Sequence, residues 1–178
     1  VVISPEGEPL RVIDLSSETG RKREPQMLSV PASVKRTVKP IAFRFWDKTA
    51  YLFGRIADAE KSPEKEHALF RSTHFDLLKK ATDVGLVAFR RFVESWTPAR
   101  FDAPPFTPEM LDANFIFRLD GDQIWLHERE AARRLLDARS GDRDDGPLCL
   151  VTGERGPTQR LHPTIKNVDG AQSSGASL

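Results

Sequence analysis

The stretch SPEKEHALFRSTHFDLLKKATDVGLVAFRRFVESW, residues 62–96, decides the fold because its apolar residues recur at helical spacing. Ser62, Pro63 and Glu64 supply an N-cap side chain, a first-turn proline and an early acid, all favourable at the start of a helix. The face of this first helix that is predicted to be buried holds Phe70, His74, Leu77, Leu78 and Ala81. We interpret His74 as a core or helix-interface histidine.

A second helix is predicted from about Asp83 to Trp96. Its spacing buries one face and leaves Arg90 and Arg91 pointing away. The residues predicted to be buried are Val84, Ala88, Phe89, Phe92 and Trp96. Pro98 ends the helix, because proline has no backbone N–H to donate.

Strands are predicted ahead of the helices. Val1–Ser4 and Leu10–Ser16 alternate well enough to be strands, and the intervening PEGEP has the turn chemistry of a hairpin. Residues 17–25 lack apolar periodicity and are predicted to form a loop, and Met27–Val30 a short strand. Phe43–Phe53 is rich in aromatic residues, which favour strands, so we expect a core β segment there.

The residues after the second helix predict further short elements. Asn114–Leu119 and Gln123–Leu126 are predicted to form a hairpin around Asp120–Asp122. Glu128–Arg139 is predicted to be the third substantial helix, with its alanines and leucines inward. We also expect a short helix at Thr107 and a last strand at residues 148–151.

These elements predict an α+β fold of short, mainly antiparallel strands and hairpins with three principal helices. Strict βαβ alternation and internal repeats are absent from the sequence. A length of 178 residues, 39% of them hydrophobic, is enough for one buried core. We therefore expect a single compact domain over residues 1–178.

Composition also bounds the compartment. The longest apolar runs are far shorter than a membrane span, and no signal peptide is visible, so we expect a soluble protein without membrane partners. Cys149 is the single cysteine, which fits a reducing compartment, and we expect the cytoplasm. The strand-like start at Val1 and the end in GAQSSGASL lead us to expect a piece of a longer protein.

Positive charge is concentrated near the start of the chain. The whole sequence carries +1, whereas the residues from Arg21 to Lys48 hold eight basic and two acidic side chains. This segment also contains Phe43, Phe45 and Trp46, and cations beside aromatic rings can pair with phosphates while bases pack on the rings. A local polyanion contact is one interpretation. The other is a solvated loop whose aromatic residues belong to the core.

Catalytic and metal-binding patterns are weak. No two histidines have the i, i+4 spacing of a helical metal site, and Cys149 with His162 lacks a CxxC partner for zinc. The same pair could act as a nucleophile and base, but no base is visible beside Cys149. The loop at Thr152–Pro157 lacks the Gly-Lys-Ser/Thr of a nucleotide-binding P-loop, and Gly170–Ser177 could be a linker or a binding loop. We predict no cofactor, no metal and no enzymatic activity.

Three segments carry a family resemblance: VKRT from Val34, FWDKTAYLFG from Phe45, and CLVTGERGPTQRLHPTIKNVDGAQSSGASL from Cys149. Together they resemble the large-subunit family of the type I-C CRISPR Cascade complex, the Csd family. The third segment is the most specific, because it is long and irregular. The chain is similar to the early part of that longer subunit, without its first residues and its later regions.

The resemblance implies a role in antiviral defence. The large subunit of such a complex recognises the protospacer-adjacent motif in duplex DNA and assists strand separation, while the guide RNA reads sequence by pairing. The implied partners are double-stranded target DNA, the guide RNA, other Cascade subunits and a recruited nuclease-helicase that cleaves. Acidic phage inhibitors that imitate DNA are a further partner class for such a surface.

The resemblance implies that two groups of residues contact DNA. The first lies in the basic segment and comprises Lys35, Arg36, Lys39, Arg44, Lys48 and Thr49. The second comprises Gln172, Ser173 and Ser174. Two alternatives stay open: a structural module that docks on the RNA handle or on an acidic protein, and a nucleotide-processing enzyme that uses the glycine-containing loops.

Overall fold

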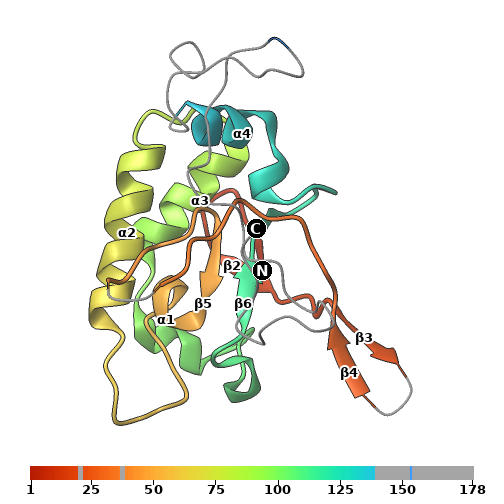
Figure 1. The fold of residues 1–178 in the computed structure, drawn as a ribbon, viewed down its shortest axis with the longest axis vertical. Helices are drawn as coiled ribbons and strands as arrows, with labels where there is room; N and C mark the ends of the chain where they lie inside the picture. The colour runs from red at the N-terminus through yellow and green to blue at the C-terminus, as the bar shows by residue number, and fades with distance from the viewer. Residues whose placement is uncertain (20–21, 37–38, 139–152, 154–178) are drawn as a thin grey trace. The chain divides into compact units, whose positions relative to one another are not determined.

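The computed structural model describes residues 1–19, 22–36, 39–138 and 153. Residues Val1–Leu136 form one compact unit, and Asp137–Leu178 form a second unit. The elements labelled in Figure 1 belong to the first unit, apart from the last residue of α4. The predicted strand at residues 148–151 lies outside the described residues.

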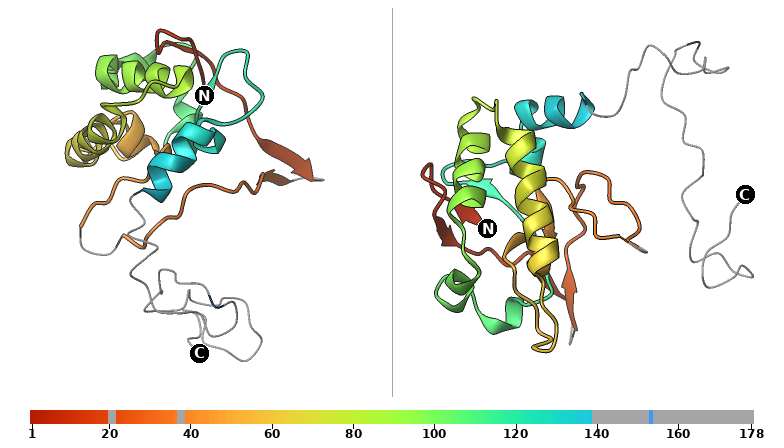
Figure 2. Two further views of the ribbon diagram at one scale, coloured as in Figure 1. Left: turned by 90° about the horizontal axis from the view of Figure 1, so that it is seen from above. Right: turned by 90° about the vertical axis from the view of Figure 1, so that its left-hand side faces the viewer.

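Helices α2 (Glu64–Leu78) and α3 (Val84–Ser95) pack side by side, as Figure 2 shows. Helix α3 begins where the Asp83 side chain accepts a hydrogen bond from the Leu86 N–H (3.1 Å). Helix α2 begins after Pro63 and has no side-chain cap, so the predicted cap at Ser62 is wrong. Both helices were expected, because their apolar residues recur every three to four positions.

Most of the predicted buried face is confirmed. Phe70, His74, Leu77 and Leu78 of α2 are buried, as are Ala88, Phe89, Phe92 and Trp96 at α3. Val84 is 54% exposed, so its predicted burial is wrong. It occupies the first turn, on the solvent side of the helix, and Leu86 and Val93 extend the buried face instead.

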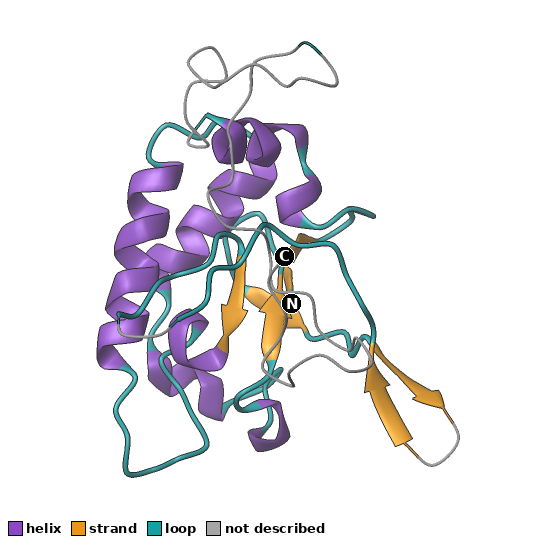
Figure 3. Cartoon of the chain, in the orientation of Figure 1, coloured by secondary structure: helices purple, strands orange, loops and turns teal. Residues whose placement is uncertain are grey.

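The strands are short. β1 (Val2–Ile3) pairs antiparallel with β2 (Pro9–Arg11) and parallel with β7 (Arg118–Leu119), while β5 (Trp46–Lys48) pairs antiparallel with β6 (Asn114–Ile116). Figure 3 shows the long helices on one side of these strands. The predicted hairpin at the start of the chain is confirmed, although its second strand ends at Arg11.

Gly7 explains how this first hairpin packs on α3. Its φ is +89°, and a Cβ at this position would lie 2.5 Å from the backbone nitrogen of Phe92. Only glycine permits both the left-handed backbone and the close approach.

Three predictions ahead of the helices are corrected. Residues 17–25 were expected to be a loop, but β3 (Ser16–Thr19) and β4 (Lys22–Pro25) form an antiparallel hairpin. No strand forms at Met27–Val30. The expected β segment at Phe43–Phe53 contains only β5 and then the short helix α1 (Thr49–Leu52). Apolar periodicity reports burial, so it misses a hairpin without an apolar face and cannot separate a short buried strand from a short buried helix.

The predicted hairpin at residues 114–126 is also wrong. β6 and β7 pair with β5 and β1, and residues 123–126 contain no strand. The turn itself exists, since Gly121 has a φ of +84° and the Asp122 N–H donates to the Leu119 carbonyl (3.1 Å). Long-range pairing therefore overrides the local hairpin signal.

Short helical segments complete this part of the chain. The 3-10 helix η1 covers Pro98–Asp102, and η2 (Pro108–Met110) confirms the short helix expected at Thr107. A third 3-10 helix, η3 (Leu126–Glu128), precedes α4 (Glu130–Asp137), which confirms the third principal helix with a later start and an earlier end than predicted.

The core is mainly aromatic. The Phe53 ring lies within 4.9–6.3 Å, centroid to centroid, of six aromatic rings from α3, η1 and the following loop, and β6–β7. The fold is α+β, as predicted. A single domain over residues 1–178 stays a prediction. Among the described residues, no helix has the length and apolar character to span a membrane.

Candidate nucleic-acid interface

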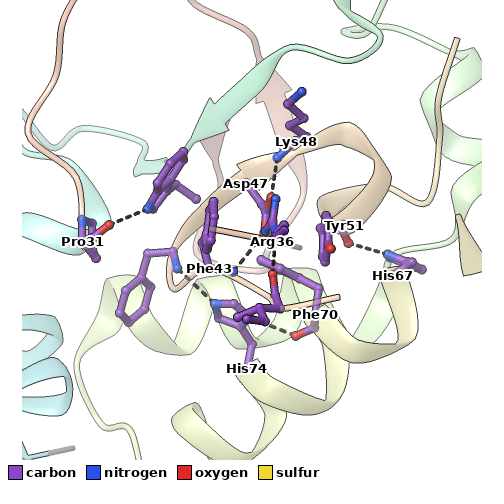
Figure 4. Close-up of polar contacts among 12 residues, drawn as sticks. Pro31, Arg36, Phe43, Asp47, Lys48, Tyr51, His67, Phe70 and His74 are labelled. Atoms are coloured by element: carbon purple, nitrogen blue, oxygen red, sulfur yellow. Dashed lines mark hydrogen bonds and ion pairs between the residues drawn. The ribbon is translucent and has the colours of Figure 1, made fainter. Parts of the chain in front are cut away.

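Arg36 is the centre of the basic segment. Its Nε–H donates to the carbonyl of Ile41 (2.7 Å), and its Nη2 donates to Oδ2 of Asp47 (2.5 Å). The guanidinium carbon lies 3.6 Å from the centroid of the Phe43 ring and 3.8 Å from that of Tyr51. Figure 4 shows the guanidinium between these two rings. Arg36 is therefore bound within the protein, with a side chain that is 22% exposed.

Asp47 is the buried partner of this arginine. The carboxylate is fully buried, and it also accepts hydrogen bonds from the N–H groups of Phe43 (2.9 Å) and Lys48 (2.8 Å). Burial raises the pKa of Asp47, and the hydrogen bonds from Arg36 and the two backbone groups act against that rise. The ion pair and the aromatic contacts join Arg36 to Asp47, Phe43 and Tyr51.

His74 binds the backbone just before β5. Phe45 has a φ of +66°, an unfavourable value for a bulky residue, and its N–H donates to Nε2 of His74 (3.0 Å). Nδ1 of His74 donates to the Phe70 carbonyl (2.9 Å), which fixes the neutral tautomer. Burial lowers the pKa of His74 to about 4. The interpretation of His74 as a core histidine is confirmed.

The other predicted cations differ in exposure. Lys35, Lys39 and Lys48 are exposed, and Figure 4 shows Lys48 pointing away from Arg36. Arg44 is half-buried. The structure thus exposes three lysines of the basic segment to solvent, whereas the side chain of Arg36 is packed against the protein.

Thr49 differs from these lysines in its burial. Thr49 is fully buried, and its Oγ1 accepts a hydrogen bond from the Asp112 N–H (2.9 Å). It can support a binding surface but has no access to a ligand. Gln172, Ser173 and Ser174 lie outside the described residues.

Beside Lys48, the sheet face opposite to Asp47 carries a groove of about 560 Å³. Trp46 and Lys48 alternate with Asp47 along β5, and they face Ile116 and Asn114 across the register of β6. These four residues line the groove. Among the described residues that line the groove, Lys48 is the one cation, and Asp14 and Asp112 contribute two carboxylates.

Sequence reasoning missed two features of this region. Asn114 lies opposite Lys48 on β6, and only strand pairing brings these residues together from 66 positions apart. Tyr51 is the second aromatic ring against Arg36, and we call the contacts of Arg36 with Asp47, Ile41, Phe43 and Tyr51 the Arg36 clamp. The available signal was the spacing of Tyr51 from Asp47 in WDKTAY, because the short helix α1 turns Tyr51 towards Arg36.

Metal and catalytic chemistry find little support among the described residues. No group of three or more His, Cys, Asp or Glu side chains there is arranged to hold a metal ion. His67 and His127 each bind a backbone carbonyl through one ring nitrogen, and burial lowers the pKa of both. Cys149 and His162, the pair that the sequence disfavours as a zinc site, lie outside the described residues.

Comparison with known proteins identifies the family. The family model of the CRISPR-associated protein Cas_Csd1 matches residues 1–178. No curated protein matches the chain. The family match agrees with the resemblance found in the basic segment and in the last thirty residues, and it spans every residue of the sequence. The chain belongs to the Cas_Csd1 family of CRISPR-associated proteins.

Proposed function

We propose that the segment from Lys35 to Lys48 contacts the duplex DNA that carries the protospacer-adjacent motif, and assists its strand separation within a type I-C Cascade complex. One observation carries this proposal: the segment presents Lys35, Lys39 and Lys48 to solvent beside Arg36, which is held by Asp47 and two aromatic rings. Exposed lysines can neutralise phosphates and set the register of a protein on DNA.

Base reading in this proposal falls to the β5–β6 pair. Lys48 can donate to guanine in the major groove, and the amide of Asn114, opposite in register, can pair with adenine. Lys35 and Lys39 then contact phosphates without sequence preference. This division separates residues that set affinity from residues that set motif preference.

The remaining assignments follow from the same proposal. The chain acts without catalysis of its own, in the cytoplasm, together with the guide RNA and other Cascade subunits, and a recruited nuclease-helicase cleaves the target. Gln172, Ser173 and Ser174 remain proposed DNA contacts, as does Arg44. Acidic inhibitors that imitate DNA would compete for the exposed lysines.

The test measures binding of short duplexes, with and without the motif, to the assembled complex over a range of salt concentrations. The variant is Lys35→Ala/Lys39→Ala/Lys48→Ala. The matched control is Lys65→Ala/Lys79→Ala/Lys80→Ala, which removes three exposed lysines from α2 and the turn that follows it.

The variant is expected to weaken duplex binding and to lower the salt slope by about two, because Lys35 and Lys39 each lose a phosphate contact that contributes about 0.9. It is also expected to lose preference for the motif, because Lys48 is absent. The control is expected to bind like wild type. Equal behaviour of the two variants would refute a DNA contact at this segment. If the lysine variant fails to assemble into the complex, the result would instead favour the alternative in which this segment docks on the RNA handle or on an acidic protein.

A further inference from the structure

The side chain of Arg36 closes a loop of the basic segment. Arg36 and Asp47 are eleven positions apart, and the arginine joins them directly while also binding the Ile41 carbonyl between them. The Phe43 N–H adds a second bond to Asp47 (2.9 Å). Two points of the loop, Ile41 and Phe43, are therefore tied to one ion pair.

The clamp depends on the shape of the guanidinium group. A flat, delocalised cation can lie between two aromatic rings and still donate hydrogen bonds from its edge. Arg36 does both, with Phe43 and Tyr51 at 3.6 and 3.8 Å and its donors directed at Ile41 and Asp47. A lysine ammonium in the same place keeps the charge but loses the stacking and the fork of donors.

A direct contact of Arg36 with DNA would conflict with this arrangement. A phosphate would have to draw the guanidinium away from Asp47, which is fully buried and would then lose its charged partner. The neighbouring Lys35 and Lys39 are exposed and need no such rearrangement.

We infer that Arg36 is a positioning residue: it orders the loop and so aims Lys35 and Lys39, and it does not itself contact DNA. This inference rests on the proposed function, because the aim of the lysines matters only if they bind DNA. It reassigns the central cation of the basic segment from ligand contact to loop geometry.

The test is a double-mutant cycle in the assembled complex. It compares wild type, Arg36→Lys, Lys35→Ala/Lys39→Ala and the triple combination, with Arg71→Lys as the control. Arg71 also donates to backbone carbonyls, those of Val93 and Glu94, but it lies on α2. The two readouts are amide hydrogen exchange over residues 39–47 and the salt dependence of duplex binding.

Arg36→Lys is expected to speed exchange at residues 39–47, above all at Phe43, and to leave the amides of α2 and α3 unchanged. It is expected to weaken duplex binding by about tenfold in the wild-type background and to have no effect once both lysines are absent. Arg71→Lys is expected to change neither readout.

Two results would overturn the positioning role. One is unchanged exchange in Arg36→Lys. The other is an equal loss of binding in both backgrounds, which would make Arg36 a direct contact. If the lysine pair variant binds duplex like wild type, the DNA contact fails, whereas faster exchange in Arg36→Lys would still support the ordering of the loop.

Discussion

Replacing Asp47 with Asn is expected to destabilise the chain strongly, although the two side chains have nearly the same shape. The buried carboxylate accepts hydrogen bonds from Arg36 at Oδ2 (2.5 Å), from Phe43 at Oδ2 (2.9 Å) and from Lys48 at Oδ1 (2.8 Å). Asparagine offers one oxygen and places an NH2 group at the other position, where it meets a donor.

The magnitude follows from these contacts. One backbone N–H or the guanidinium loses its acceptor, which lowers the free energy of unfolding by about 1–3 kcal/mol for a buried group. The charge pairing with Arg36 is lost as well. Because Arg36 is 22% exposed, water compensates part of the second loss. We expect a decrease of about 3 kcal/mol in the free energy of unfolding, a large share of the ~5–15 kcal/mol typical of domains.

Urea unfolding followed by tryptophan fluorescence measures this change at pH 8, where the carboxylate is ionised. With a slope of about 2 kcal/mol per M, the midpoint should fall by about 1.5 M. Asp76→Asn is the control, because it makes the same chemical change on an exposed residue of α2. A shift for Asp47→Asn no larger than that of the control would refute the clamp as a source of stability.

Three further predictions concern the same region. Lys48→Ala in the assembled complex should reduce the preference for the motif-bearing duplex by about 1–3 kcal/mol without changing the unfolding midpoint, and an unchanged preference would remove Lys48 from base reading. The free energy of unfolding should fall as the pH drops from 6.5 towards 4, and His74 should account for up to about 3 kcal/mol of this loss. The pKa of His74 is about 4 in the folded chain and 6.5 in the unfolded chain, so the unfolded chain binds the proton at a higher pH. His74→Gln should flatten that part of the pH profile, and urea titrations at pH 7.5 and 4.5 compare the two proteins; a profile as steep as that of wild type would contradict this assignment. Thr49→Val should cost about 1 kcal/mol because the N–H of the exposed Asp112 loses its protein acceptor, while leaving the salt slope unchanged, and a lowered slope would contradict the assignment of Thr49 to the core.

The parts of the fold that follow from local periodicity could be predicted. α2 and α3 were expected because their apolar residues share one face, and the first hairpin because PEGEP separates two alternating segments. The pairing of β7 with β1 and of β6 with β5 joins residues far apart in the sequence, and no local pattern encodes it. The α+β class was therefore predictable, but the sheet topology was not.

The candidate site divides in the same way. Charge counting found the segment that holds Lys35, Lys39 and Lys48, and all three are exposed. The same count gave Arg36 an equal role, although it lies between Phe43 and Tyr51 and binds Asp47. Composition records that a cation is present, whereas its availability depends on which rings and carboxylates the fold brings to it.

Site-specific photo-crosslinking in the assembled complex tests the central claim most directly. A photoreactive amino acid is placed at Lys35, Lys39 or Lys48, and at Lys65 and Lys79 of the α2 region as controls, and the complex is irradiated with a motif-bearing duplex. The account predicts crosslinks from the first three positions to DNA at or beside the motif, and none from the controls. Crosslinks from Lys35, Lys39 and Lys48 only to guide RNA or to another subunit would contradict it and identify the segment as a docking surface.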